Sequence, residues 1–236
     1  LLVVALDRFK ESMAVPRDYV LVFFDDQEAL YLNARHYPEL ASQYTLTALD
    51  PSDLHADNVA SLLIRNDQEL LLKEARRLLE IHPDGLLTNQ AVAVLFNEDG
   101  AFDRALPHAE AIIRNLPEAI TGYGLKGDAL QGLHAFAEAL VCYRMALRRA
   151  SAKKQGEIYK QMGLAYQQLG QYQKSYEALT QGIKPFDGNT SYKDLYELGA
   201  AALHVGRHQE AVLYLRLAAN KVPPTDVEWY HRLKAL

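Results

Sequence analysis

The sequence lacks several features by which whole classes of protein are recognised. It holds a single cysteine, Cys142, so an internal disulfide framework is excluded. Its apolar start, Leu1–Leu6, is too short to span a bilayer and follows no charged segment of the kind that a signal peptide carries. What remains is a globular chain of 236 residues, long enough for one large domain or two ordinary ones.

Basic residues are neither in excess nor clustered. The formal net charge is −5, and Lys and Arg are scattered along the chain. A nucleic-acid-binding protein usually carries a basic stripe, so we expect no nucleic-acid partner. With 49% hydrophobic residues the chain can build a core, and we expect a soluble protein, in the cytoplasm rather than the periplasm. Because the chain does not begin with Met, we interpret it as a fragment or processed product of a larger protein, from which a signal peptide could have been removed before this numbering starts.

What the sequence does contain is a helical hairpin pattern, clearest in Tyr159–Leu179. Apolar and small residues recur there at spacings of three and four, as on one face of an α-helix. Gly170 interrupts this stripe, and a second helical stripe follows it. Two short amphipathic helices joined by a tight turn form an antiparallel hairpin, which cannot bury its apolar face without similar neighbours. The first stripe consists of Met162, Gly163, Tyr166 and Leu169, and the second of Tyr172, Tyr176 and Leu179.

Two independent series of residues repeat with nearly the same period. Four prolines stand 35, 32 and 34 residues apart, and each marks the end of a helix because proline cannot continue one. Four small residues, which let two helices approach closely, stand 34, 36 and 36 residues apart. The first series is Pro16, Pro51, Pro83 and Pro117, and the second is Ala105, Ala139, Ser175 and Ala211.

This pattern resembles the tetratricopeptide repeat, a helix pair of about 34 residues that stacks into a solenoid. The resemblance implies an all-α fold, a right-handed α-solenoid of about six stacked antiparallel helix hairpins with partial repeats at both ends. The small residue that the family favours in the first helix is matched by Ala93, Gly127, Gly163 and Gly199, whereas Gly122 lies off that position. Aligned to the family, the chain is a single solenoid over 1–236, with a partial repeat at 1–19, repeats at 20–51, 52–85, 86–119, 120–153, 156–189 and 192–225, and a capping or truncated helix at 226–236.

The first repeats match the family pattern least. Val20–Phe24 is rich in β-branched and aromatic residues, so propensity alone would allow a buried strand. We see no partner strand in the sequence and therefore predict a helix there. The segment before Pro16, which includes Ala5, Phe9 and Ser12, matches the second helix of a repeat.

Three patterns could carry chemistry, and in each of them a structural role is favoured. Gly122–Gly127 has the G-x-G-x-x-G spacing of dinucleotide-binding loops, but a helix rather than a strand is predicted before it. His204 and His208 have the spacing of a zinc-binding pair, but a turn falls between them and no third ligand is evident. Cys142 falls in the middle of a predicted helix, where a buried thiol is inert. We therefore predict no enzyme activity, no cofactor and no metal.

The resemblance implies that one face of each first helix lines a concave groove for a protein or an extended peptide. Amide side chains suit this role because they both donate and accept hydrogen bonds, although each could equally be a solvated helix residue. Lys160 stands where some family members hold a carboxylate, but Leu164 replaces the asparagine of that clamp, so chaperone tails are not expected. The expected groove residues are Gln90, Asn97, Glu98, Asp128, Gln131, Glu157, Lys160, Gln167, Gln168 and Tyr196, with an apolar patch at Leu63 and Ile64.

Three functions remain open at this point. The first is a binding scaffold or adaptor that uses the groove. The second is a helical accessory module of a larger enzyme or of a bacterial export or assembly machine. The third is a structural multimer that self-associates through its end helices. None of the three requires direct insertion into a membrane.

Overall fold

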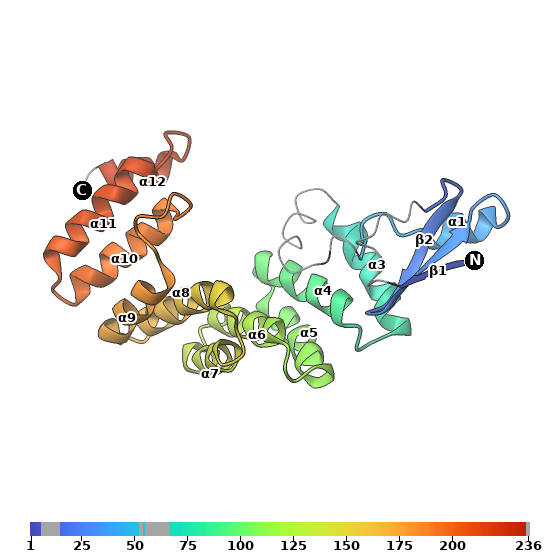
Figure 1. Ribbon diagram of the computed structural model, residues 1–236, viewed down its shortest axis with the longest axis horizontal. Coiled ribbons are helices and arrows are strands. Elements are labelled where there is room, and N and C mark those ends of the chain that lie inside the picture. The colour runs from blue at the N-terminus through green and yellow to red at the C-terminus, as the bar shows by residue number, and fades with distance from the viewer. Residues whose placement is uncertain (6–14, 52–53, 55–66, 235–236) are drawn as a thin grey trace. The chain divides into compact units, whose positions relative to one another are not determined.

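The computed structural model describes residues 1–5, 15–51, 54 and 67–234 of the chain (Figure 1). The described chain divides into two compact units, Leu1–Gly132 and Leu133–Leu236. The first unit holds a small sheet, a short helix and four longer helices, and the second holds helices only over its described residues.

The first unit begins with a three-stranded antiparallel sheet. Its strands are β1 (Leu2–Ala5), β2 (Tyr19–Phe24) and β3 (Glu28–Asn33), in the spatial order β1-β3-β2. Alternate residues point to opposite faces of a strand. One face therefore joins the core of this unit, through Val4, Leu21, Phe24, Ala29 and Tyr31.

The prediction of a helix over Val20–Phe24 is wrong, because these residues form β2. Their β-branched and aromatic side chains favour a strand, and the partner that the sequence seemed to lack is β3. Asp25 closes the turn between the two strands, because its carboxylate accepts hydrogen bonds from the N–H groups of Gln27 and Glu28. The segment Glu28–Asn33 reads EALYLN, and its Glu, Ala and Leu residues favour helix on propensity. Pairing with β2 overrides that preference.

The structure also contradicts two broader predictions for this region, the helix pair expected at 20–51 and the partial helical repeat expected at 1–19. Residues 20–51 contain β2, β3 and one short helix, α1 (Pro38–Tyr44). Ala5, expected in a helix, ends β1, while Phe9 and Ser12 lie outside the described residues. The regular proline spacing misled here, since Pro16 shortly precedes the strand β2 and Pro51 lies seven residues beyond the end of α1, so neither marks the end of a second helix.

A buried carboxylate attaches this N-terminal region to the helices. Glu74 lies on α3 (Gln68–Ile81) and is only 5% exposed. Its two carboxylate oxygens accept hydrogen bonds from the backbone N–H groups of Thr47, Ala48 and Leu49, at 2.8, 3.0 and 2.9 Å. The Thr47 hydroxyl adds a fourth bond of 3.1 Å. A buried carboxylate is tolerated because its acceptor sites are occupied.

The sheet also caps a helix. The helix α4 (Leu86–Glu98) begins after Gly85, which has no side chain to cap it. The carboxylate of Asp26, at the turn between β2 and β3, accepts hydrogen bonds of 2.9 Å from the N–H groups of both Leu86 and Leu87. An acid at this position satisfies free N–H groups and favours the positive end of the helix dipole.

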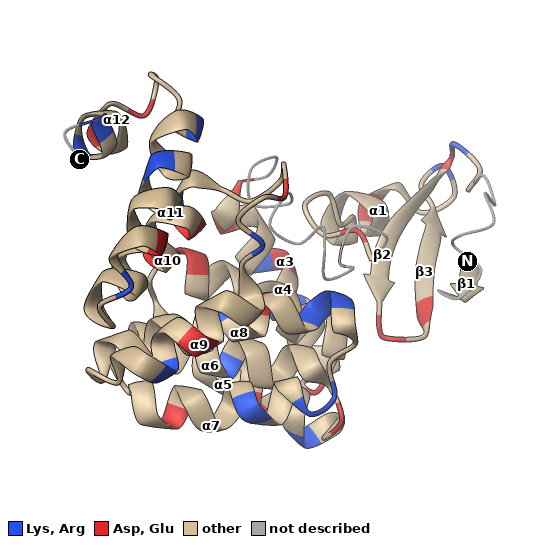
Figure 2. Cartoon of the chain, turned by 60° about the vertical axis from the view of Figure 1, so that its left-hand side comes forward, with Lys and Arg blue, Asp and Glu red and all other residues tan. Residues whose placement is uncertain are grey.

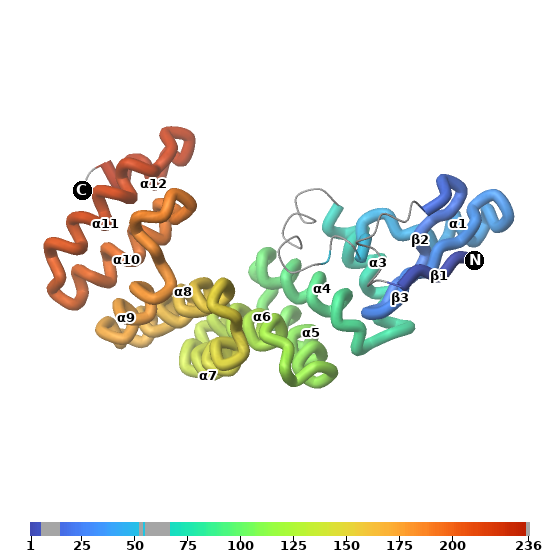
Figure 3. Tube along the Cα trace, in the orientation of Figure 1, coloured from blue at the N-terminus to red at the C-terminus, as the bar shows by residue number. Residues whose placement is uncertain are grey.

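The remaining helices form hairpins. In the first unit α4 packs on α5 (Phe102–Asn115), which packs on α6 (Ile120–Gly132). In the second unit α7 (Phe136–Leu147) is followed by the pair α8 (Ala152–Gln168) and α9 (Tyr172–Gly182), the pair α10 (Tyr192–His204) and α11 (His208–Lys221), and α12 (Val227–Lys234). Within each unit the trace reverses between the helices of a pair (Figure 3). Gly100, Gly170 and Gly206, in the turns between such helices, adopt positive φ angles, as does His134 before α7. These four turns stand 34, 36 and 36 residues apart.

Neighbouring hairpins of the second unit are linked by contacts between residues that lie 34 apart. Lys160 Nζ lies 3.4 Å from Asp194 Oδ1, and Tyr176 Oη donates a hydrogen bond to a Glu210 carboxylate oxygen. Tyr192 Oη donates likewise to Asp226. Because the same separation recurs from α8 to α12, the hairpins stack with a regular repeat, as in a solenoid.

Small residues set the distance between the helices of each hairpin. The predicted series Ala105, Ala139, Ser175 and Ala211 is buried, with no member more than 1% exposed. A Cβ atom added at Gly163 would lie 2.6 Å from Leu179 Cγ, and one added at Gly199 would lie 2.8 Å from Leu215 Cγ. The expectation that Gly122 is free of such contact is wrong, since its Cβ would lie 2.9 Å from side-chain atoms of Ile112 and Ile113.

Two glycine substitutions are expected to change stability in opposite directions. Gly163→Leu should lower the free energy of unfolding by about 1–3 kcal/mol, because the added atoms overlap Leu179. Gly124→Ala, at a helical glycine with nothing within 4 Å of the added Cβ, should raise it by about 0.5–1 kcal/mol. Urea denaturation followed by circular dichroism measures both. Equal midpoints for wild type and Gly163→Leu would contradict the close packing of α8 on α9.

A second prediction concerns the buried carboxylate. Glu74→Gln should lower the free energy of unfolding by about 1–3 kcal/mol, because the amide nitrogen cannot accept the hydrogen bonds offered by Ala48 and Leu49. Hydrogen exchange at these two amides should accelerate. Glu80→Gln, on the exposed side of the same helix, is the matched control and should leave both measurements unchanged. Unaltered exchange in Glu74→Gln would show that the carboxylate does not hold this loop.

Candidate functional site

The first helices of the second unit, α8 and α10, share a polar face with α12. We call the side chains Glu157, Lys160, Gln167, Gln168, Asp194, Tyr196, Glu197 and Arg232 the first-helix face. Their contacts run from α8 to α10 and from α10 to α12. Acidic and basic residues are interspersed along these helices (Figure 2).

Lys160 lies at one end of this face, between two carboxylates. Its Nζ is 2.6 Å from Glu157 Oε2 and 3.4 Å from Asp194 Oδ1, and its side chain is 23% exposed. Burial acts to lower the pKa of Lys160, but the hydrogen bonds and charges of Glu157 and Asp194 outweigh it and raise the pKa above its ordinary value. Lys160 is therefore a charged, paired residue, and a ligand carboxylate would have to compete with two that are already present.

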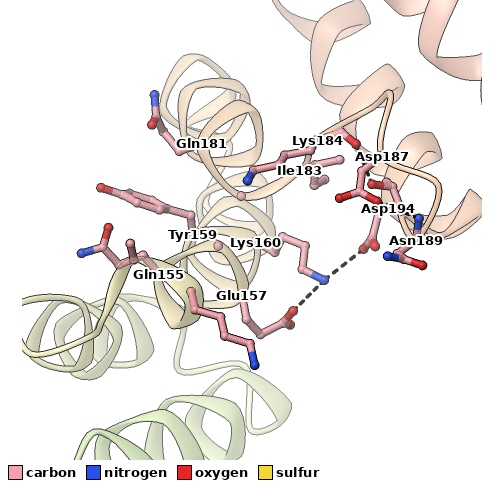
Figure 4. Close-up of a pocket in the computed structure, with 15 residues that line it drawn as sticks. Gln155, Glu157, Tyr159, Lys160, Gln181, Ile183, Lys184, Asp187, Asn189 and Asp194 are labelled. Atoms are coloured by element: carbon pink, nitrogen blue, oxygen red, sulfur yellow. Dashed lines mark hydrogen bonds and ion pairs between the residues drawn. The ribbon is translucent and has the colours of Figure 1, made fainter.

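A cavity of about 480 Å³ surrounds this ion pair. The start of α8, the end of α9, the loop after α9 and Asp194 of α10 form its walls (Figure 4). Figure 4 shows the Lys160 side chain reaching toward both Glu157 and Asp194. Polar side chains dominate the rest of the lining and include Lys153, Gln155, Gln181, Lys184, Asp187 and Asn189.

Gln167 and Glu197 form the middle of the face. Gln167, at the end of α8, makes a side-chain hydrogen bond to Glu197 of α10. Burial raises the pKa of Glu197, and the charge of Asp194 adds to this, while Arg232 and the bond from Gln167 act in the opposite direction. Gln167 Oε1 is buried and has no hydrogen-bond partner among the described residues. An acceptor oxygen without a partner is a costly feature in a folded protein.

An aromatic cluster closes the other end of the face. The rings of Tyr196 and Trp229 meet edge to face, with centroids 5.0 Å apart. The Arg232 guanidinium lies over both rings, at 4.6 and 4.9 Å, and donates a hydrogen bond of 2.6 Å to Tyr196 Oη. Sequence reasoning named Tyr196 but missed Arg232 and Glu197. Trp229 could have indicated these two residues, because it stands where the first helix of a further repeat would begin, and that helix carries Arg232.

In the first unit the expected groove residues are less open. Gln90 is only 7% exposed, and its Nε2 lies 3.4 Å from the carbonyl oxygen of Leu54. Asn97 Nδ2 donates a hydrogen bond of 3.1 Å to the carbonyl oxygen of Leu125, which joins α4 to α6. Asn97 Oδ1 is buried without a partner in the described chain, as Gln167 Oε1 is. The amides at the ends of α4 and α8 thus each bond to the next first helix.

The other expected groove residues take various positions. Glu98 is exposed, whereas Asp128 and Gln131 are half-buried and engaged with neighbours. Glu157 and Gln168 are exposed on α8. Leu63 and Ile64 lie outside the described residues.

The three motifs that could carry chemistry have ordinary places in the helices. Gly122–Gly127 lies within α6, so the strand that a dinucleotide loop requires is not there. His204 stacks on Tyr172, with centroids 4.2 Å apart and planes 7° from parallel, while His208 begins the next helix. Cys142 is buried on α7. Over residues 1–5, 15–51, 54 and 67–234, no three His, Cys, Asp or Glu side chains gather to hold a metal ion.

None of the helices described here is both long enough and apolar enough to cross a membrane.

Solved structures share this fold. TTC0263, a tetratricopeptide-repeat protein of Thermus thermophilus, aligns with a TM-score of 0.60 at 19% identity, over 79% of this chain and 98% of its own. PilF of Pseudomonas aeruginosa gives a TM-score of 0.60 at 17% identity, over 70% and 73%. A chain of the APC/C hetero-tetramer Cut9–Hcn1 gives 0.57 at 20% identity, over 68% of this chain and 30% of that one. The prediction of a helical solenoid with the tetratricopeptide-repeat fold is confirmed.

The sequence itself matches no protein-family model and no curated protein.

The raised pKa of Glu197 leads to a pH-dependent prediction. At a pH above the pKa of Glu197 in the folded protein, its carboxylate is ionised in both states but desolvated only in the folded one, which lowers the free energy of unfolding. At a pH below 4.5, the pKa in the unfolded chain, the carboxyl group is protonated in both states and this cost is absent. Glu197→Gln should therefore raise the free energy of unfolding near pH 7 by up to about 1 kcal/mol, because water still screens part of this side chain. The amide can also donate to Gln167 Oε1.

This difference should shrink as the pH falls through the folded pKa and vanish below the unfolded one. Denaturation at a series of pH values measures it. Glu177→Gln on α9, where the carboxylate is exposed, serves as the control. A constant difference at all pH values would contradict a desolvated Glu197.

Proposed function

We propose that this chain is a binding scaffold whose second unit holds an extended peptide segment of a partner protein on the first-helix face. The observation that carries the proposal is the row of hydrogen-bonding and aromatic side chains along α8, α10 and α12. Protein interaction is the general role for which a repeat scaffold of this fold is suited. A solenoid offers an extended surface with regularly spaced side chains, which an extended chain can follow.

The two ends of the face offer different contacts. At the aromatic end, Tyr196 and Trp229 supply large, rigid surfaces with polar tips, which is typical of residues that dominate interface energies. In the middle, Gln167 Oε1 lacks a hydrogen-bond partner in the described chain. If the Gln167 side chain turns outward, this oxygen can accept a backbone N–H of the peptide and gain the bond that it lacks.

The charges of the face select the partner. Glu157, Asp194 and Glu197 are set against Lys160 and Arg232, so the acids exceed the bases by one. Both basic groups already have partners, Lys160 in its two carboxylates and Arg232 in the Tyr196 hydroxyl. The segment bound here is therefore neutral or basic, and an acidic tail is disfavoured by repulsion.

The test uses a peptide selected from a displayed random library against the purified chain. Trp229 is the one tryptophan of the sequence and lies beside the face, so its fluorescence reports binding there. Glu157→Ala and Gln168→Ala remove exposed groups of α8 and should each weaken binding by about 0.5–1.5 kcal/mol. Calorimetry measures the affinities, and melting temperatures should stay close to wild type because both positions are exposed.

A matched control lies on the second helix of the same hairpin. Gln173 and Glu177 of α9 are exposed and joined by a 2.8 Å hydrogen bond, much as Gln161 and Glu157 of α8 are joined at 3.0 Å. Gln173→Ala with Glu177→Ala should leave affinity unchanged. If the α8 pair of substitutions has no effect, or the α9 pair has the larger effect, the first-helix face is not the binding site.

A further inference from the structure

The sheet of the first unit leaves an apolar groove on the face that points away from the core. Its residues come from β2 and β3 (Val22, Phe23, Leu30, Leu32), from α1 (Leu40, Tyr44) and from α3 (Arg77, Ile81), and we call it the sheet groove. Its volume is about 400 Å³, within the usual range of ligand sites. Seven of these eight residues are apolar or aromatic.

An irregularity in β2 makes this groove. The register between β2 and β3 shifts after Leu21, so that Leu21 pairs with Tyr31 and Phe23 pairs with Leu30. Val22 is the extra residue of this bulge. A bulge re-aims side chains that strict alternation would send to opposite faces. As a result two consecutive residues, Val22 and Phe23, both line the groove, although Phe23 also packs against the core, while Leu21 and Phe24 are buried in that core.

The rim of the groove is apolar and open to solvent. Ile81, at the end of α3, is 66% exposed, and Leu40 and Tyr44 of α1 are 45% and 39% exposed. Three large apolar side chains around one groove are a concentrated patch, and such patches mark binding surfaces more often than isolated exposed residues do. On β3 the groove residues Leu30 and Leu32 alternate with the core residues Ala29 and Tyr31, so the groove lies on the face of this strand that the core leaves uncovered.

Among the described residues that line the groove, Arg77 is the one that carries a charge. Its Nη2 donates to the carbonyl oxygens of Tyr44 and Val22, at 2.6 and 3.2 Å, and its Nη1 lies 3.4 Å from that of Gln43. These bonds fix the guanidinium but leave its charge in place, because carbonyl groups are neutral. Among the ion pairs formed by the described residues, none includes Arg77.

Of the five N–H groups of a guanidinium, Nε–H and one on Nη1 have no acceptor in the described parts of the chain. Arg77 is therefore a rigid cation with donors to spare at the edge of an apolar groove. A carboxylate is the group that best complements it.

We propose that the sheet groove binds a partner protein segment that carries adjacent apolar side chains followed by a carboxylate. The apolar side chains fill the space between Phe23, Leu30 and Ile81, and the carboxylate pairs with Arg77. A membrane surface fits less well, because lipid headgroup binding needs a cluster of several Lys or Arg residues, whereas the groove is lined by one. This site is independent of the first-helix face and of the function proposed for it.

The test starts from a phage-displayed library of random peptides selected against the whole chain, with the Ile81→Ser variant used to remove peptides that bind elsewhere. The retained peptides should share an apolar pair with a nearby Asp or Glu. In methyl-detected NMR titrations, the best of them should shift the signals of Leu30, Leu32, Leu40 and Ile81 in a saturable way. Replacing its acid by the matching amide should weaken binding by about tenfold, the cost of one charge-assisted bond.

Two variants separate binding from folding. Ile81→Ser should weaken binding about tenfold without lowering the melting temperature, because Ile81 is largely exposed. Leu116→Ser, at a residue 45% exposed just past the end of α5, is the matched control and should bind normally. Arg77→Gln should abolish the preference for the acidic peptide over its amide, because it removes the positive charge that pairs with the carboxylate, whereas Arg77→Lys, which keeps the charge, should retain part of that preference.

Other outcomes would overturn the proposal. These are a library that yields no peptide dependent on Ile81, or peptides that bind equally well with an amide in place of the acid. The same methyl shifts caused by vesicles of anionic lipid, or by raising the protein concentration alone, would assign the groove to a membrane or to a second copy of the chain.

Discussion

The close approach of two helices within each hairpin is the constraint on which the rest of the structure depends. Gly163 and Gly199 touch the leucines of the following helix so closely that an added Cβ atom would overlap them. The two helices of a hairpin therefore lie close together, and some of their apolar side chains pack against the next hairpin. Stacking follows from this geometry, because a single hairpin leaves its apolar stripe exposed to water. The same stacking brings together polar side chains that are 34 residues apart in the sequence, and these form the recurring hydrogen bonds and ion pair.

A stack of hairpins has an exposed first member, and here a sheet covers it. The core residues of β1, β2 and β3 form one cluster with those of α3 and α4. Asp26 caps α4, and Glu74 holds the chain that follows α1. In these bonds a carboxylate side chain accepts from backbone N–H groups. They therefore fix the position of the sheet on the helices although the sheet lacks the sequence pattern of the helical repeats. A solenoid end can thus be closed by a different kind of structure, provided that its apolar face is covered.

The sequence predicted the helical part of this fold because the signal there is redundant. Small residues and turns both repeat every 34 to 36 residues, and either series would place the helices of 86–119, 156–189 and 192–225. The sheet was missed because its evidence is not local. EALYLN favours helix by propensity, and only pairing with YVLVFF makes it a strand. The face of Gln167 could be read from periodicity, but its bond to Glu197 could not, since that partner lies one repeat away.

The two candidate binding surfaces differ in what a ligand must displace. On the first-helix face the polar groups already bond to one another, as Lys160 does to Glu157 and Asp194. A peptide there exchanges existing hydrogen bonds for new ones, so its net gain per bond is small. In the sheet groove, apolar side chains face water and Arg77 keeps its charge without an acidic partner in the described chain. A ligand that buries this apolar surface gains binding free energy and breaks few existing hydrogen bonds. The groove therefore suits a short, tight anchor, whereas the first-helix face suits a longer segment held by many weak contacts.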